Sequence, residues 1–444
     1  MNHFIQTIKN IWRIEDLRFR ILMTLGLVAI YRVGSYIILP GIDASQLQQL
    51  EDQGGKGIFG LVDIFAGGAF TRASIFALGI MPYISASIVM QLLGMAVPAV
   101  QKLQKDESGR RTVNQYTRIL TVVVTALQAS AYVVYIKSLG AQILVSPGLF
   151  WLSTLVVLTA GTIFVMWLGE KITDKGIGNG ISLLIMVGIL ARLPFALAAE
   201  FSSRMSAGGN GGLVAFIGEI AALIGVIILV ILLVQGTRKI PVQYAKRIVG
   251  NKQYGGVRQY IPLKVNAAGV MPIIFAQALM FIPATISQFF PDSAASKGAG
   301  VFTDHTSFWY NIIFSILIIV FTYFYTALIV NPVQMADDMK RNGGFIPGIK
   351  PGKKTADFID GIMSRITLPG SFFLALVAIL PAFAAMFGMI SDFGNFYGGT
   401  SLLIMVGVIL DTLQQIESHL LMRHYDGLMK SGRIKGRTSA ASAY

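Results

Sequence analysis

The sequence offers few side chains that could carry out covalent chemistry. It contains no cysteine, which excludes disulfides, thiol catalysis and cysteine-ligated metal. Neither HExxH nor GxSxG occurs, and the four histidines (His3, His305, His419 and His424) lie near the chain ends or near loops. We therefore expect no enzyme active site, no metal site and no cofactor.

One glycine-rich run, Gly176-Ile177-Gly178-Asn179-Gly180, could cradle a phosphate group. It lacks the Lys-Ser/Thr pair of a P-loop and follows no predicted strand. Tight helix packing or the start of a helix explains this run better than nucleotide binding does.

Arg32 and Asp411 are the clearest ionisable residues at membrane depth, and such residues are functional candidates by default. An ion-coupled transporter usually needs several of them converging near the midplane. A secondary transporter of small solutes stays open as an alternative, with these two residues as its only obvious polar contributors.

The most regular candidates are six isoleucines. Two pairs have members four residues apart, which puts their side chains on one face of a helix, and two single residues lie in later apolar segments. They are Ile80 with Ile84, Ile181 with Ile185, Ile274 and Ile404. Spacing alone fits lipid-facing or core isoleucines better than a functional lining.

These candidates must be positioned by membrane-spanning helices. Hydrophobic residues make up 54% of the chain and charged residues 13%, against about 25% charged in soluble domains. Ten apolar segments approach the roughly 20 residues needed to cross a bilayer as a helix. They are residues 19–39, 73–93, 117–137, 151–171, 177–199, 213–234, 267–289, 309–331, 368–389 and 400–421.

The placement of positive charge predicts the topology. If both termini are cytosolic, 29 of the 36 Lys and Arg residues fall on the cytosolic side, counting Arg20 at the start of the first span. Six fall outside, Arg192 and Arg204 among them, and Arg32 lies within the first span. Short cytosolic loops carry such an excess, so we predict ten spans with an amphipathic cytosolic N-terminus at 1–18 and a basic cytosolic tail at 422–444.

The stretch Gly57–Leu93 is too long for one crossing and is interrupted at Gly67-Gly68. Residues 73–93 supply one span, which leaves a short apolar run before them. A segment that stops halfway is tolerated only where protein or a water-filled cavity surrounds it. The stretch therefore predicts a plug or re-entrant segment hinged between Gly67 and Arg72.

Two long loops, 235–266 and 332–367, are predicted to be cytosolic. The first carries seven positive charges and no acid, and the second is dense in Pro and Gly. A cytosolic location explains why these loops are positively charged, but not why they are long and, in the second loop, rich in turn-forming Pro and Gly. We therefore expect ordered, irregular loops that dock an acidic partner or RNA phosphates. A membrane receptor for RNA or ribosomes without a pore would also explain these loops, but not the broken stretch.

A weak internal repeat supports two related halves. Gly79-Ile80-Met81-Pro82-Tyr83-Ile84 recurs as Gly269-Val270-Met271-Pro272-Ile273-Ile274, five spans later. An odd number of spans inverts the second copy. The predicted halves are residues 19–200 and 201–421, and inverted repeats place a pathway between them.

Long motifs resemble the SecY family, the channel subunits of the bacterial protein translocase. The resemblance covers residues 13 to 425 and is carried by Ser74–Ile88, Gly109-Arg110-Arg111, Met166–Glu170, Gly176–Ser182, Pro262–Asn266 and Gly399–Ile404. It implies an all-α polytopic membrane protein, in which ten transmembrane helices form two inverted five-helix halves around a central hourglass pore with a re-entrant plug helix. It implies no enzymatic activity.

The same resemblance assigns roles that spacing could not. The six isoleucines match the constriction ring, and residues 58–71 match the plug, whose members here are Ile58, Phe59, Leu61, Val62, Ile64, Phe65, Gly67, Gly68 and Phe70. Spans two and three against seven and eight match a lateral gate, with Ser85, Gln128 and Gln277 as candidate polar contacts. The basic loops match a docking surface for motor and ribosome, comprising Arg238, Lys239, Lys246, Arg247, Lys350, Lys353 and Lys354.

Partners and location follow from the resemblance as expectations. They are a heterotrimer with SecE and SecG, the SecA motor ATPase, the ribosome, preproteins and nascent membrane proteins, the lipid bilayer of the bacterial inner membrane, and SecDF and YidC as accessory partners. One departure is Lys350, where the family usually has arginine. Lysine keeps the charge but lacks the planar bidentate fork, which bears on coupling to the motor.

Overall fold

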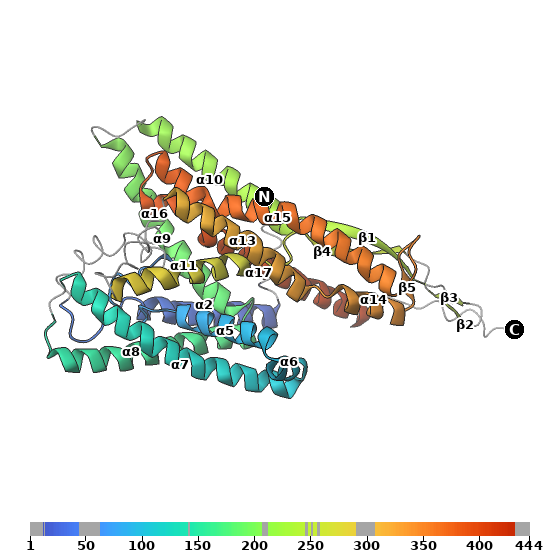
Figure 1. Cartoon of the computed structure of the whole chain (residues 1–444), viewed down its shortest axis with the longest axis horizontal. Helices are drawn as coiled ribbons and strands as arrows, with labels where there is room; N and C mark the ends of the chain where they lie inside the picture. The colour runs from blue at the N-terminus through green and yellow to red at the C-terminus, as the bar shows by residue number, and fades with distance from the viewer. Residues whose placement is uncertain are drawn as a thin grey trace. The chain divides into compact units, whose positions relative to one another are not determined.

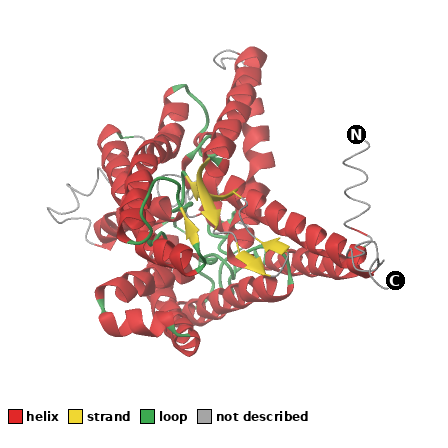
Figure 2. Ribbon diagram, turned by 90° about the vertical axis from the view of Figure 1, so that its right-hand side faces the viewer, coloured by secondary structure: helices red, strands yellow, loops and turns green. Residues whose placement is uncertain are grey.

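Helices dominate the structure, a computed structural model that describes residues 12, 14–43, 63–140, 143–206, 212–244, 247–249, 252–254, 258–289 and 307–430 (Figures 1 and 2). Each of the ten predicted spans overlaps a helix. These are α2 (Glu15–Gly34), α5 (Met81–Ala96), α7 (Glu107–Ser138), α8 (Pro147–Lys175), α9 (Gly180–Met205), α10 (Gly212–Gln235), α11 (Met271–Phe289), α13 (Phe308–Ile329), α15 (Lys353–Met386) and α17 (Gly399–Lys430).

Seven helices in the described part of the chain are long and apolar enough to cross a membrane. Shorter apolar helices lie at Met81–Gly94 and Met271–Met280, within α5 and α11. Only helices satisfy their own backbone hydrogen bonds across such lengths of hydrocarbon, apart from closed barrels. The chain is therefore a multi-pass membrane protein.

The chain divides into two compact units. The first comprises the described residues of 1–52, 65–189 and 408–444, and the second those of 53–64 and 190–407. Helices α9 and α17 each run from one unit into the other. The two predicted halves, 19–200 and 201–421, remain a prediction.

In the first unit, α5 packs against α7, α7 against α8, and α2 against α8. A short helix, α6 (Pro98–Lys105), also packs on α7. Glycine makes room for the chain that leads into α5. A Cβ at Gly161 of α8 would lie 2.3 Å from the carbonyl oxygen of Ile75, so this close approach requires a residue without a side chain.

The predicted span 73–93 is not helical throughout. Residues 67–80 form turns around an isolated bridge between Ser74 and Ile38, and α5 begins only at Met81. Positive φ angles at Gly79 (53°) and Ala73 (47°) are incompatible with a right-handed helix at those positions. The second copy of the repeat behaves alike, because Gly269 has a φ of 63° and turns precede α11 at Met271. Each helix has proline as its second residue, where the missing N–H is harmless.

The second unit contains a small sheet that the all-helical expectation did not include. Its strand order is β4-β1-β5, from β1 (Thr237–Tyr244), β4 (Arg258–Lys264) and β5 (Gly344–Phe345). β1 pairs antiparallel with β4 over its length, and with β5 at Gln243↔Phe345 and Tyr244↔Gly344. A separate hairpin joins β2 (Arg247–Val249) to β3 (Lys252–Tyr254).

Helices α13 and α15 pack together in the second unit, with α11 against α13 and α10 against α15. The expected irregular loop 332–367 is largely helical instead. It contains α14 (Pro332–Arg341), whose N-cap Asn331 accepts from the N–H groups of Val333 and Gln334, and α15 already begins at Lys353. Its proline- and glycine-rich part covers only the turns around β5.

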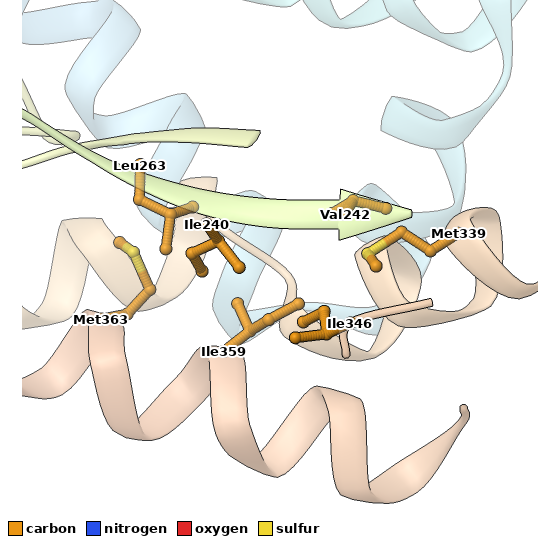
Figure 3. Packing of buried hydrophobic residues seen from close by; sticks show 7 residues of the cluster. All are labelled: Ile240, Val242, Leu263, Met339, Ile346, Ile359 and Met363. Carbon is orange, nitrogen blue, oxygen red and sulfur yellow. The ribbon is translucent and has the colours of Figure 1, made fainter. Parts of the chain in front are cut away.

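A buried apolar cluster, shown in Figure 3, joins the two basic loops. We call the region that packs around this cluster, formed by β1, β4, β5, α14 and the start of α15, the sheet module. Side chains from the sheet meet side chains from α14, the segment after β5 and α15. They are Ile240, Val242, Leu263, Met339, Ile346, Ile359 and Met363. Ile240 and Val242 are buried on one face of β1, Lys239 lies on the opposite face, and both Arg238 and Lys239 are exposed.

Candidate functional site

The predicted plug is a buried, non-spanning segment in the part that the structure describes. Residues 63–66 form one helical turn, and every residue from 63 to 71 is buried. Ile64, Phe65 and Phe70 are each less than 8% exposed. Four predicted plug residues, Ile58, Phe59, Leu61 and Val62, lie outside the described residues.

Gly67 and Gly68 form the predicted break, and both have positive φ angles, 65° and 87°. The backbone of Gly67 lies directly against Gly188 of α9. A Cβ built on Gly67 would be 2.8 Å from the Gly188 Cα, and one built on Gly188 would be 2.8 Å from the Phe65 carbonyl oxygen. The predicted plug therefore touches α9 backbone to backbone.

Two side chains of neighbouring helices donate to backbone carbonyls of the predicted plug. The Tyr132 hydroxyl of α7 donates to the Phe70 carbonyl over 2.6 Å, and the two rings meet edge to face at 4.8 Å. Arg32 of α2 donates to the Gly67 carbonyl over 3.2 Å. Turn carbonyls without helical partners are thus satisfied by side chains, which keeps a non-helical segment in a buried place.

Arg32 therefore has a structural partner rather than a place in a polar transport site. Its guanidinium also donates to the Tyr36 hydroxyl over 3.4 Å, and the Arg72 guanidinium lies 4.5 Å from the centre of the Tyr36 ring. Asp411 is exposed on α17. The alternative hypothesis of a secondary transporter therefore loses Arg32, one of the two residues proposed for its polar site.

Asp63 is a functional candidate that the sequence patterns did not single out. It is 1% exposed and forms an ion pair with Arg192 of α9, in the second unit. A single acid within an apolar run was the available signal, because a buried carboxylate needs a partner. The charge pattern counts Arg192 on the outside, within the predicted span 177–199, and the structure places it in α9.

A second missed group is a buried triad of Glu200, Arg204 and Glu219, each less than 7% exposed. Arg204 Nε lies 2.9 Å from Glu200 and its Nη2 lies 2.5 Å from Glu219. Glu200 also accepts from the Ile390 N–H over 2.8 Å, and Arg204 donates to the Gly388 carbonyl. The triad joins α9, α10 and the segment that precedes α16 (Ser391–Gly394).

The six isoleucines are divided between the units. Ile80 immediately precedes α5 and is buried, Ile84 lies in its first turn, and Ile181 and Ile185 lie in the first two turns of α9. These four belong to the first unit. The other two, Ile274 of α11 and Ile404 of α17, belong to the second, and the closed ring remains a prediction.

The predicted lateral-gate contacts are divided in the same way. Ser85 of α5 and Gln128 of α7 lie on packed helices of the first unit, and Gln277 of α11 lies in the second. All three are partly buried. The Ser85 hydroxyl donates to the Met81 carbonyl of its own helix over 3.1 Å. Their joint role remains a prediction.

The predicted docking residues belong to the sheet module. Arg238 and Lys239 are exposed on β1, and Lys350, Lys353 and Lys354 are exposed around the start of α15. Lys246 and the side chain of Arg247 lie outside the described residues. The pairing of β1 with β5 fixes the two basic loops to one another.

The glycine run 176–180 forms a helix start, not a phosphate cradle. The N–H groups of Ile177, Gly178 and Gly180 donate to Thr24, Gln415 and Thr173 at 3.1, 2.8 and 2.9 Å. Asn179 caps α9 by accepting from the N–H groups of Ile181 and Ser182. These amides are engaged within the chain and are not presented to an anion.

Comparison with known sequences gives extensive matches. The model of the SecY family matches residues 74–413. The protein translocase subunit SecY of Streptomyces galbus is 44% identical over 441 residues, covering 94% of this chain and 98% of its own length. That of Chlamydia trachomatis is 41% identical over 455 residues, covering 97% and 99%.

Solved structures share the fold. One is a SecY channel whose plug domain is described as stabilising the closed state and maintaining a membrane seal. It has a TM-score of 0.63 and 19% sequence identity, and the match covers 90% of this chain and 92% of that one. The Sec61 channel of a canine ribosome–channel complex has a TM-score of 0.59 with 17% identity and the same coverage. At these identities the likeness supports the fold.

Proposed function

The chain belongs to the SecY family, and on this premise we propose that it works as a gated protein-conducting channel, the central subunit of a Sec translocon. The observation that carries the proposal is 44% identity to a translocase subunit over 94% of the chain. The channel passes unfolded preproteins across the membrane and releases apolar segments sideways into lipid. The chain does no catalysis, and a separate motor or the ribosome drives transport.

The ring of Ile80, Ile84, Ile181, Ile185, Ile274 and Ile404 forms the constriction in this proposal. Aliphatic rings exclude water when narrow, so they block ions at rest. They make few directional contacts, so they accept any passing polypeptide and close loosely around it. A solute transporter needs a polar site at the membrane midplane, and such a site would neither block ions at rest nor accept any passing polypeptide.

The plug closes the channel at rest. Its support is the segment that follows Asp63, buried against α9 and α7 through backbone contacts and the Tyr132 hydrogen bond. A segment held by a few specific contacts, and not by a continuous helix, can leave and return without unfolding the helices around it.

The lateral gate lies between spans two and three and spans seven and eight, with Ser85, Gln128 and Gln277 as its polar contacts. A signal sequence that reaches this gate gains free energy from apolar burial in lipid, at about 25 cal/mol per Å². This exit requires no energy source within the chain.

The sheet module is the docking surface for the ribosome and the SecA motor. Its support is a buried core that fixes both loops and leaves the side chains of Arg238, Lys239, Lys350, Lys353 and Lys354 exposed. Such charges suit RNA phosphates and acidic protein surfaces. SecE and SecG complete the heterotrimer, and SecDF and YidC assist it. We place the protein in the bacterial inner membrane with both termini cytosolic.

The experiment that tests the seal is ion leak from vesicles containing the full complex. The double variant Ile84→Ser/Ile274→Ser should raise the leak, because hydroxyls allow the constriction to become wet. Leu213→Ser, an exposed position at the start of α10, serves as the matched control. A leak equal to that of the wild type would remove both isoleucines from the seal.

A further inference from the structure

The described part of the predicted plug begins with a buried charge, Asp63, whose partner lies on α9. Asp63 Oδ2 contacts Arg192 Nη2, and the two side chains are 2% and 22% exposed. We propose that this ion pair couples the plug to α9, so that the plug is fully seated or fully released. The inference rests on the proposed channel function, which does not itself assign either residue a role.

Burial makes the two charges depend on each other. A carboxylate taken out of water without a cation is strongly disfavoured, whereas a paired one is tolerated. Asp63 is therefore stable in its buried place while Arg192 remains beside it. When they separate, both groups must gain water, which disfavours a partly displaced plug.

Helix α9 contacts the plug at two successive turns. Gly188 faces Gly67 backbone to backbone, and Arg192, four residues later, pairs with Asp63. Residues four apart lie on the same face of a helix. One face of α9 therefore holds the plug by shape at one turn and by charge at the next.

Arg192 also lies beside a weak point of its helix. Pro194 is inside α9 and has no N–H to donate to the carbonyl of residue 190. A helix lacking this hydrogen bond bends more easily there. Bending at Pro194 would move Arg192 relative to Asp63, which gives α9 a means of releasing the plug.

The test is a double-mutant cycle on the full complex in vesicles, with ion leak as the readout. Arg192→Gln leaves the buried Asp63 carboxylate without its cation, and Asp63→Asn leaves the partly buried Arg192 without its anion, so each should raise the leak by about tenfold or more. The double variant Asp63→Asn/Arg192→Gln should leak less than the leakier single variant. Asp16→Asn removes an exposed ion pair with Arg20 of α2 and should leave the leak unchanged.

A second readout reports the plug directly. Because the chain has no cysteine, Thr71→Cys introduces a single thiol at a position that is 5% exposed. A membrane-impermeant thiol reagent should label it slowly in the otherwise unchanged protein and faster in either single charge variant. This distinguishes plug release from general unfolding, which would also expose protease sites.

The outcomes separate this inference from the proposed function. If preproteins enter vesicles but neither single variant changes leak or labelling, the coupling is wrong and the channel stands. If the effects of the two single variants multiply in the double variant, the residues act independently and the coupling is also wrong. If the unsubstituted complex imports no preprotein, the proposed function itself fails.

Discussion

Replacing Gly188 by alanine should loosen the plug without weakening α9. The new Cβ would lie 2.8 Å from the Phe65 carbonyl oxygen, 3.3 Å from the Gly67 nitrogen and 3.5 Å from the Gly67 Cα. The first distance is too short for a carbon–oxygen contact, and its partner is backbone, so the plug must shift. Within α9 itself, alanine favours the helix by about 1 kcal/mol over glycine.

The two effects differ in sign and act on different equilibria. Overpacking a well-packed site costs about 1–3 kcal/mol. Applied to the seated plug, this changes the ratio of closed to open channel by about 5- to 150-fold, since roughly 1.4 kcal/mol is a factor of ten. Global stability should stay equal or fall by up to about 2 kcal/mol, because the helix gain of about 1 kcal/mol offsets only part of the overpacking cost.

The assay pairs ion leak from vesicles with the melting temperature in detergent. Gly188→Ala should leak more than the wild type, while its melting temperature stays equal or falls by a few degrees at most. Gly225→Ala is the matched control, because a Cβ at Gly225 inside α10 would meet nothing within 4 Å, so this variant gains helix stability alone. A sealed Gly188→Ala channel would refute the backbone contact as a determinant of closure.

Three further predictions concern other contacts. Tyr132→Phe keeps the ring against Phe70 but removes one of the two donors to the Phe70 carbonyl, which retains the Ala73 N–H. Leak should therefore rise by the equivalent of about 0.5–1.5 kcal/mol, and an unchanged leak would contradict this. Arg204→Met leaves two buried carboxylates without their cation and should lower the free energy of unfolding by about 3–5 kcal/mol, as measured by thermal denaturation. Arg118→Met, at an exposed ion pair, should lower it by less than about 1 kcal/mol, and equal losses would contradict this prediction. Ile359→Ala should lower the stability of the sheet module by about 2–5 kcal/mol, because it removes a buried side chain from its core. Loop 235–266 should then be proteolysed faster and the complex should cosediment less with ribosomes. Unchanged ribosome binding would refute the sheet module as the docking surface.

The sequence was most informative about the spans. Each depends on local composition over about 20 residues, and an apolar helix is the structure that satisfies its own backbone in lipid. The repeat at Gly79 and Gly269 also proved useful, because both glycines have positive φ angles before a helix that begins with Met-Pro. Local sequence determines such turns and helix starts.

The sheet module was missed because its pairing is not local. Ile240 and Val242 lie two residues apart, which is typical of one face of a strand, but Pro241 lies between them and proline is disfavoured inside a sheet. β5 is only two residues long and lies about a hundred residues from β1 along the chain. No periodic pattern could be read from two residues.

The buried ion pairs were missed for a related reason. Arg192 and Arg204 were counted among external positive charges, since a sequence shows the sign of a charge but not its partner. Asp63 lies 129 positions from Arg192, and only the fold brings them together. The candidate plug could be predicted as a segment, whereas the contacts that seat it could not.

The most direct test of the central claim is preprotein import into vesicles that contain this chain with its small partner subunits, a motor and ATP. We predict that a preprotein with a signal sequence becomes protected from added protease, and that omitting this chain abolishes protection. Equal protection in vesicles without the chain would contradict its role as the protein-conducting channel.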